Sequence, residues 1–130
     1  MTRIETLAVH IDRLLTTNNI SVEYKQGTKG RSWCKSRRVR LSPVKSDVTY
    51  AIALHEIGHI LGDHPKTRID KEVAAWQWAK THSLVWTPEM QATASKRLSS
   101  YVAWSRRHQT MKVPGPDHPI FTQWNSMEQI

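Results

Sequence analysis

The residues with the strongest chemical signal form one short stretch, His55-Glu56-Ile57-Gly58-His59, near the middle of the chain. In an α-helix, side chains four positions apart share one face, so His55 and His59 can both reach a single metal ion. Glu56, next to the first histidine, is placed to activate a water molecule. The spacing therefore predicts a metal site with His55 and His59 as ligands and Glu56 as the general base.

A buried helix is needed to position this motif, and the sequence predicts one over Val48–Leu61. Ser46 or Asp47 is placed to cap its start, and Gly62 ends it. The helix is apolar on most sides, so we expect it to be buried. Three titratable side chains inside a buried helix need compensation, which a metal ion supplies.

A third ligand is predicted on the next helix, which the spacing of apolar residues places over Ile69–His82. Glu72 shares a face with small residues such as Ala75, and Gly58 offers a matching gap on the preceding helix. Because a catalytic zinc usually takes three protein ligands, close packing of the two helices would make Glu72 the third. The alternative is that Glu72 is a surface acid favoured by the helix dipole.

The remaining elements predict an α+β domain over residues 1–112. In chain order they are a helix over 3–17, short strands over 20–24, 31–34 and 38–42, and a final helix over 88–108. The order of the strands in the sheet stays open. Residues 113–130 begin with prolines and a glycine, which predicts an extended C-terminal tail. Apolar residues in this tail could pin it to the domain or to a partner: Ile120, Phe121 and Trp124.

The chain is basic, with 19 Lys and Arg against 11 Asp and Glu and a net charge of +8. Two stretches have basic residues and no acid. The first holds Lys25, Lys29, Arg31, Lys35, Arg37, Arg38, Arg40 and Lys45, and the second holds Lys96, Arg97, Arg106, Arg107 and Lys112. Such patches attract acidic proteins or nucleic acid, although the alternative is a solvated basic surface. No helix-turn-helix is evident, so sequence-specific reading of DNA is not expected.

Cysteine and hydropathy patterns restrict the class of protein further. A single cysteine, Cys34, excludes an intramolecular disulfide framework and fits a reducing compartment. It lies in a basic segment with no obvious catalytic partner. No apolar run follows Met1, so neither a signal peptide nor a membrane span is predicted, and we expect a cytoplasmic protein. Most of the six tryptophans are expected in the core.

Two segments of the sequence, Ala53–Gly62 and Glu72–Ala79, carry a resemblance to a known family. The chain resembles the small metallopeptidase-like proteins of phages and mobile elements, the ImmA/IrrE type, within the broader gluzincin pattern. The resemblance covers about residues 39–90, and its first motif is the specific part. It implies a minimal zincin-like fold, with an N-terminal helix, a small three-stranded sheet, an active-site helix and a glutamate helix.

The resemblance also implies roles for particular residues. His55, His59 and Glu72 would bind Zn²⁺, with a fourth position left for water, and Glu56 would be the general base. The second motif departs from the Glu-Ala-Asn-x-Phe-Ala pattern of many members, because here it reads Glu-Val-Ala-Ala-Trp-Gln-Trp-Ala. Another alignment would place Ala74 at the ligand position. A donor for the transition-state oxyanion is left open among Tyr50, His64, His82, Tyr101 and His108.

Two functions follow from the sequence. The first is a zinc-dependent peptidase that cleaves a specific cytoplasmic protein, in the host cytoplasm if the protein is phage-encoded. The second is a non-catalytic module on the same scaffold that engages a host protein or nucleic acid through its basic surface, for example as an inhibitor of host defence. Zinc held only for folding is a third interpretation, but structural sites usually close all four positions with Cys and His. The oligomeric state is not indicated.

Overall fold

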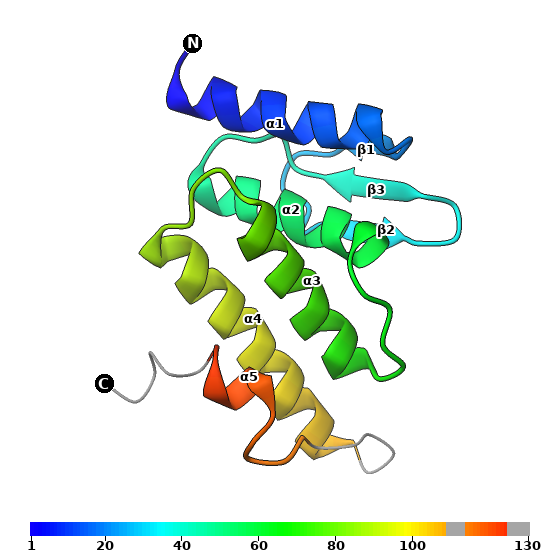
Figure 1. Cartoon of the computed structure of the whole chain (residues 1–130), viewed down its shortest axis with the longest axis vertical. Helices are drawn as coiled ribbons and strands as arrows, with labels where there is room; N and C mark the ends of the chain where they lie inside the picture. Colours follow the sequence, from blue (N-terminus) through cyan, green and yellow to red (C-terminus); the bar gives the residue numbers. More distant parts are fainter. Residues whose placement is uncertain (109–113, 125–130) are drawn as a thin grey trace.

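The computed structural model describes residues 1–108 and 114–124 and has the predicted α+β class. An N-terminal helix precedes a mixed three-stranded sheet, which is followed by three long helices and a short one (Figure 1). The elements are α1 Arg3–Thr17, β1 Ser21–Tyr24, β2 Arg31–Trp33, β3 Arg38–Leu41, α2 Asp47–Leu61, α3 Arg68–His82, α4 Pro88–Arg107 and α5 Pro119–Thr122. No helix in the described ranges is long and apolar enough to cross a membrane.

Each long helix starts at a hydroxyl residue whose side chain accepts a hydrogen bond from a backbone N–H of the first turn. These N-caps are Thr2, Ser46, Thr67 and Thr87. Such caps satisfy donors that have no partner within the helix. Of the two residues predicted to cap α2, the structure selects Ser46, and Pro88 occupies the first position of α4 as expected.

The sheet has the strand order β1-β3-β2, which the sequence left open. Strand β3 pairs in parallel with β1 and antiparallel with β2, so β2 lies at one edge of the described sheet. Val39 and Leu41 are buried on the face that packs against α1 and α2, because alternate residues of a strand point to the same side of the sheet. Arg38 and Arg40 alternate with them and lie on the opposite, more open face.

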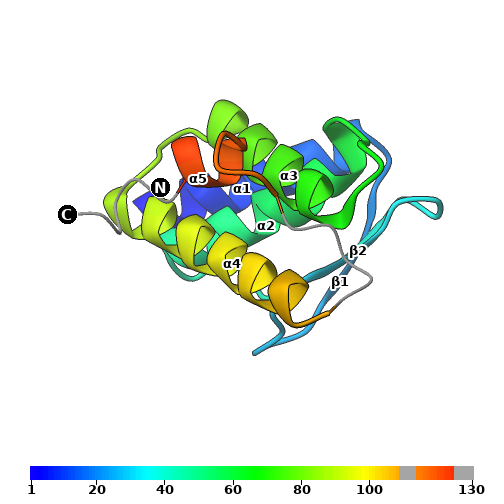
Figure 2. The same cartoon turned by 90° about the horizontal axis from the view of Figure 1, so that it is seen from below.

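Helix α2 is the centre of the fold, because it contacts the sheet, α1, α3 and α4. Helix α3 contacts α4, and Figure 1 shows the two side by side. Figure 2 shows α5 over the same part of the molecule. The α2–α3 crossing is very close at Gly58, where an added Cβ atom would lie 2.7 Å from the Ala75 carbonyl oxygen. The predicted gap at Gly58 and the small residues on α3 therefore meet, and this contact fixes which side chains of the two helices face each other.

The C-terminal segment differs from the extended tail that the sequence predicted. Residues 119–122 form the short helix α5, with Pro119 at its first position and the His118 side chain accepting a hydrogen bond from the Ile120 N–H. Ile120 and Trp124 are buried, so the segment is pinned to the domain as expected, and Phe121 is half-buried. The predicted boundary between residues 112 and 113, and residues 125–130, lie outside the described ranges.

The tryptophans divide into three groups. Trp76 and Trp124 are fully within the core, and Trp78 and Trp86 are half-buried against it. The other two have arginine side chains over their rings: Trp33 and Trp104. The expectation that most tryptophans belong to the core holds for four of the six, although only two are fully buried.

Candidate metal centre

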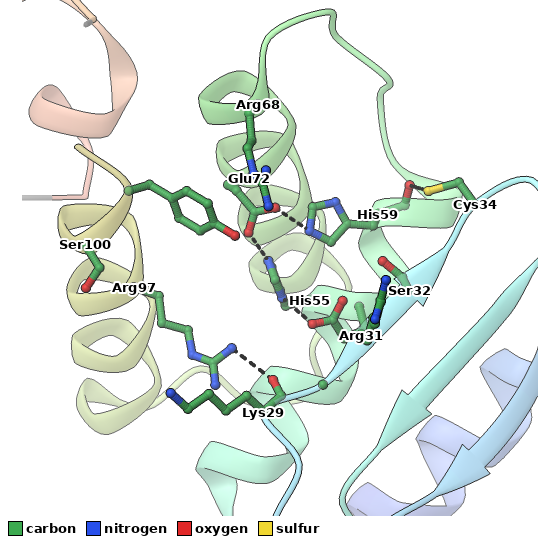
Figure 3. Close-up of a pocket in the computed structure, with 13 residues that line it drawn as sticks. Lys29, Arg31, Ser32, Cys34, His55, His59, Arg68, Glu72, Arg97 and Ser100 are labelled. Atoms are coloured by element: carbon green, nitrogen blue, oxygen red, sulfur yellow. Dashed lines mark hydrogen bonds and ion pairs between the residues drawn. The ribbon is translucent and has the colours of Figure 1, made fainter. Parts of the chain in front are cut away.

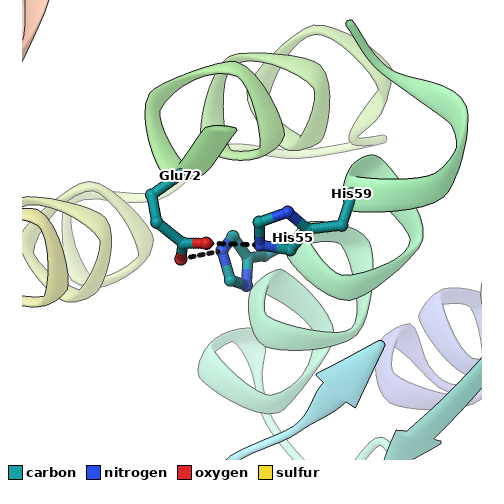
Figure 4. A group of neighbouring side chains, drawn as sticks. All are labelled: His55, His59 and Glu72. Carbon is teal, nitrogen blue, oxygen red and sulfur yellow. Dashed lines mark hydrogen bonds and ion pairs between the residues drawn. The ribbon is translucent and has the colours of Figure 1, made fainter. Parts of the chain in front are cut away.

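Helices α2 and α3 bring together the three predicted ligands, His55, His59 and Glu72 (Figure 4). One Glu72 oxygen lies 3.0 Å from His55 Nε2, and the other lies 2.7 Å from His59 Nε2. One donor atom from each residue can be chosen so that all three lie within 4.8 Å of one another. The two imidazoles and the carboxylate therefore converge on one point, as a metal site requires.

The cluster is buried and held in place by its neighbours. His55 and Glu72 are 4% and 7% exposed, whereas His59 is half-buried and lies nearer the solvent. The Trp76 ring stacks on the His55 imidazole with 4.3 Å between ring centroids. Because packing fixes the His55 ring, its Nε2 atom is aimed at Glu72 before any ion binds.

The charges in the cluster depend on one another. Burial disfavours the charged form of His55, but hydrogen bonds and charges from Glu56 and Glu72 outweigh burial and raise its pKa to about 8. Burial would also raise the pKa of Glu72, but the two imidazoles outweigh it and hold that pKa well below its usual range. Without metal, a proton on the His55 imidazole thus compensates the buried carboxylate. A cation would replace that proton, since metal ligands must be deprotonated.

The donor set fits a zinc ion with an open position. Two imidazole nitrogens and one carboxylate oxygen are the ligands of a common type of catalytic zinc site. In the described part of the chain, no fourth His, Cys, Asp or Glu completes this group. Cys34 lies nearby, but its thiol donates a hydrogen bond to the His59 carbonyl oxygen at 3.2 Å. A site that uses zinc only for folding would be expected to have a fourth protein ligand.

Glu56 lies beside the three-residue cluster and is 5% exposed. One of its oxygens is 3.3 Å from His55 Nδ1. The chain entering β2 passes very close to it at Gly30, where φ is +88° and an added Cβ atom would lie 2.9 Å from a Glu56 oxygen. Glycine is the residue that takes this conformation without strain and leaves room for the carboxylate. The role of Glu56 as general base remains a prediction.

The cluster opens into a cleft of about 710 Å³ (Figure 3). One wall is the segment that leads into and through β2, and the other comes from α4. The residues that line it besides the cluster are Lys29, Gly30, Arg31, Ser32, Cys34, Glu56, Arg68, Arg97, Ser100 and Tyr101. On α4, the sequence pointed to Tyr101 as one of five candidate oxyanion donors, but it did not place Arg97 or Ser100 at the site.

The structure also separates the five residues considered as oxyanion donors. Tyr101 lines the cleft, and burial, together with the charge of Glu72, raises the pKa of its hydroxyl, which stays protonated and able to donate. Tyr50 is buried elsewhere and its hydroxyl accepts a hydrogen bond from the Leu84 N–H. The remaining three are exposed and contact backbone carbonyls of their own segments: His64, His82 and His108.

Comparisons with protein-family models, curated proteins and solved structures gave no significant match to this chain. The resemblance to the ImmA/IrrE type therefore has no support from a whole-chain relative. The structure establishes an α+β fold with a buried His55, His59 and Glu72 cluster, consistent with a His-Glu-x-x-His metal site.

Proposed function

We propose that the protein is a zinc-dependent metallopeptidase of phage or mobile-element type that hydrolyses a peptide bond in a specific cytoplasmic protein. The observation that carries the proposal is the convergence of His55, His59 and Glu72 beside Glu56 at the base of an open cleft. A metal site with a neighbouring carboxylate base and access for a substrate has the parts that hydrolysis requires.

Each part of the cleft has a role in the proposed reaction. His55, His59 and Glu72 would hold Zn²⁺, which supplies Lewis acidity that activates water near neutral pH and polarises a carbonyl group. Glu56 takes the proton of the attacking water and passes it to the leaving amine. The Tyr101 hydroxyl donates to the oxyanion that develops on the substrate. Strand β2, at the sheet edge beside the cleft, offers backbone groups to an extended peptide.

Replacing Glu56 with glutamine tests this proposal. Glu56→Gln removes the proton acceptor but leaves the three predicted ligands, so peptide hydrolysis should fall by about 10²- to 10⁴-fold while zinc stays bound. Hydrolysis would be measured on a proteome-derived peptide library by mass spectrometry, and zinc content by elemental analysis. Glu89→Gln, at an exposed acid in the first turn of α4, is the matched control. Undiminished hydrolysis by Glu56→Gln would reject the mechanism.

A second candidate function is a non-catalytic module that engages a host protein or nucleic acid through its basic surface. The observation that favours it is a group of arginines around the Trp33 ring on the open face of the sheet, where Arg38 lies 4.1 Å and Arg31 4.9 Å from the ring centroid. Stacking orders these guanidinium groups and keeps their charge available. This function would be preferred if Arg38→Glu abolished biological activity and Glu56→Gln left it intact.

A further inference from the structure

We propose that the cleft selects an extended peptide segment with acidic side chains, which Lys29, Arg31, Arg68 and Arg97 bind on either side of the three-residue cluster. The inference names the substrate class of the proposed peptidase and rests on that function for cleavage. Selective binding of an acidic segment needs no cleavage, so the two proposals can fail separately.

The cations beside Gly30 on the first wall of the cleft form no ion pair with a carboxylate of the described residues. Lys29 and Arg31 flank Gly30 at the start of β2 and line the cleft, and the Arg31 guanidinium lies at its margin, 4.9 Å from the Trp33 ring centroid. Arg97 reaches across from α4 and donates a hydrogen bond to the Lys29 carbonyl oxygen at 3.2 Å (Figure 3). A carbonyl oxygen orients the Arg97 guanidinium without cancelling its charge, so the remaining N–H groups are available to a ligand.

The fourth cation, Arg68, is held by aromatic rings. Arg68 is the first residue of α3 and lies one turn before Glu72. Its guanidinium lies 5.9 Å from the ring centroid of Tyr101 and 5.3 Å from that of Trp104. The Tyr101 side chain also takes a hydrogen bond from Arg68. Because a guanidinium has five N–H donors, others remain to bind a carboxylate.

The charge balance of the cleft favours an acidic ligand. Within residues 1–108 and 114–124, no ion pair joins any of these four cations to a carboxylate. Among the described residues, the acids that line the cleft are Glu56 and Glu72, and both are assigned to the chemistry. A divalent cation on the cluster would offset their two charges, which leaves a concentrated positive field that attracts acidic side chains.

The surroundings favour a peptide over a nucleic acid. The edge strand β2 presents backbone donors and acceptors that an extended peptide can pair with. Tyr101 and Trp104, the aromatic residues on the α4 side, have Arg68 over their rings and so differ from the free stacking platforms typical of single-strand binding. Alternate side chains of an extended peptide would reach the same wall, so regularly spaced acids fit best.

Binding of defined peptides tests the inference. The probes are a fluorescein-labelled twelve-residue peptide of alternating Glu and Ala, and its counterpart with Gln at each Glu position. All proteins carry Glu56→Gln and Zn²⁺, so the peptides are bound without being cut, and fluorescence anisotropy gives the Kd. We expect the Glu peptide to bind at least about tenfold more tightly than the Gln peptide, since several charge pairs each contribute a few-fold.

Further substitutions show which residues cause the preference for the Glu peptide over the Gln peptide. Arg97→Gln and Arg68→Gln should each reduce the ratio of the two Kd values to about threefold or less, whereas Arg97→Lys should retain most of the preference. Arg13→Gln, at an exposed cation on α1, is the matched control and should leave the preference unchanged. Circular dichroism and zinc content show that each variant is folded and loaded. Equal Kd values for the two peptides, or an equal loss in Arg13→Gln, would overturn the inference.

Two additional arms separate the remaining explanations. A twelve-nucleotide single strand that binds more tightly than the Glu peptide, and loses that affinity in Arg97→Gln, would assign the cleft to nucleic acid and reject the proposal. Selective binding of the Glu peptide by a protein that cleaves nothing in a peptide library would support the acidic cleft and reject the peptidase. Cleavage of the library without enrichment of Asp or Glu near the cut would support the peptidase and reject the acidic cleft.

Discussion

Two carboxylates on helix α3, only two residues apart, both contact histidines, but in very different surroundings. Glu72 is buried and lies between His55 and His59 of α2. The Asp70 side chain is 42% exposed and contacts His118, the residue before α5. Hydrogen bonds from the Thr67 hydroxyl and from His118 lower the pKa of Asp70, and imidazole contacts also lower the pKa of Glu72.

The difference shows that a lowered carboxylate pKa does not by itself identify a metal site. At Glu72, two imidazoles one helical turn apart approach both oxygens of one buried carboxylate, which gives three donors around one point. At Asp70, a single imidazole and a helix-capping hydroxyl share an exposed carboxylate, an arrangement that attaches the C-terminal segment to α3. The number of converging donors and their burial separate the two regions.

The largest expected contrast concerns metal affinity. Glu72→Gln should weaken Zn²⁺ binding by more than about 100-fold, since even residues behind the ligands contribute about 10- to 100-fold. Asp70→Asn, the matched change two residues away, should alter the affinity by less than about threefold, because Asp70 lies outside the cluster. Competition with a chromophoric chelator measures both. Similar losses of Zn²⁺ affinity in the two variants would mean that Glu72 is not a metal ligand distinct from Asp70.

The next contrast concerns the α2–α3 crossing, which positions Glu72 beside the two histidines. Gly58→Ala places a methyl group against the Ala75 backbone and should lower the free energy of unfolding by about 1–3 kcal/mol. Gly115→Ala, where an added Cβ atom meets nothing within 4 Å, should change it by less than about 0.5 kcal/mol. Urea unfolding followed by circular dichroism measures both. A neutral Gly58→Ala would show that the α2–α3 contact can relax.

In the metal-free protein, the buried cluster should make the free energy of unfolding depend on pH. The pKa of His55 is about 8 in the folded state against 6.5 unfolded, so its stabilising effect is complete below pH 6.5 and is lost as the pH rises through 8. The free energy of unfolding in EDTA should therefore fall by about 1–2 kcal/mol between pH 6 and pH 8.5. His55→Gln should remove most of this slope. A slope unchanged in His55→Gln would contradict the assignment.

The smallest effect on stability is expected at the contact between Asp70 and His118. His118→Asn removes the contact with Asp70, but the buried Ile120 and Trp124 side chains still pack the segment against the core. The free energy of unfolding should fall by about 1 kcal/mol or less, as for other partly exposed ion pairs. Urea unfolding measures the change. A loss above about 2 kcal/mol would show that this pair contributes as much to stability as a buried one.

Much of the cluster could be predicted from the sequence because its geometry is local. The four-residue spacing of His55 and His59 fixes their common face once α2 is helical, and the apolar residues around them predict that helix. Glu72 required one further step, the match between Gly58 and the small residues of α3, and the structure confirms that contact. The start of α2 was also predicted from its cap, which the structure assigns to Ser46, and α4 begins at residue 88 as predicted.

Contacts between distant segments could not be predicted in the same way. The parallel pairing of β1 with β3 and the place of β2 at the edge depend on three-dimensional packing, since strands this short carry little register information. The contact of Arg97 on α4 with Lys29 was missed because these two residues are 68 positions apart in the sequence. The α5 helix was missed because prolines around it predict extended chain, whereas burial of Ile120 stabilises a single helical turn.

The short connection between α2 and α3 has a consequence for how the protein folds. His55, Glu56, His59 and Glu72 all lie in one helix–loop–helix segment, so only residues 62–67 need to close a loop to assemble them. The sheet requires β1 to pair with β3, and β2 lies between them in the sequence. Such non-local pairing is slower than the closure of a short loop between two helices. When the full-length chain refolds, we therefore expect the ligand cluster to assemble before the sheet is complete.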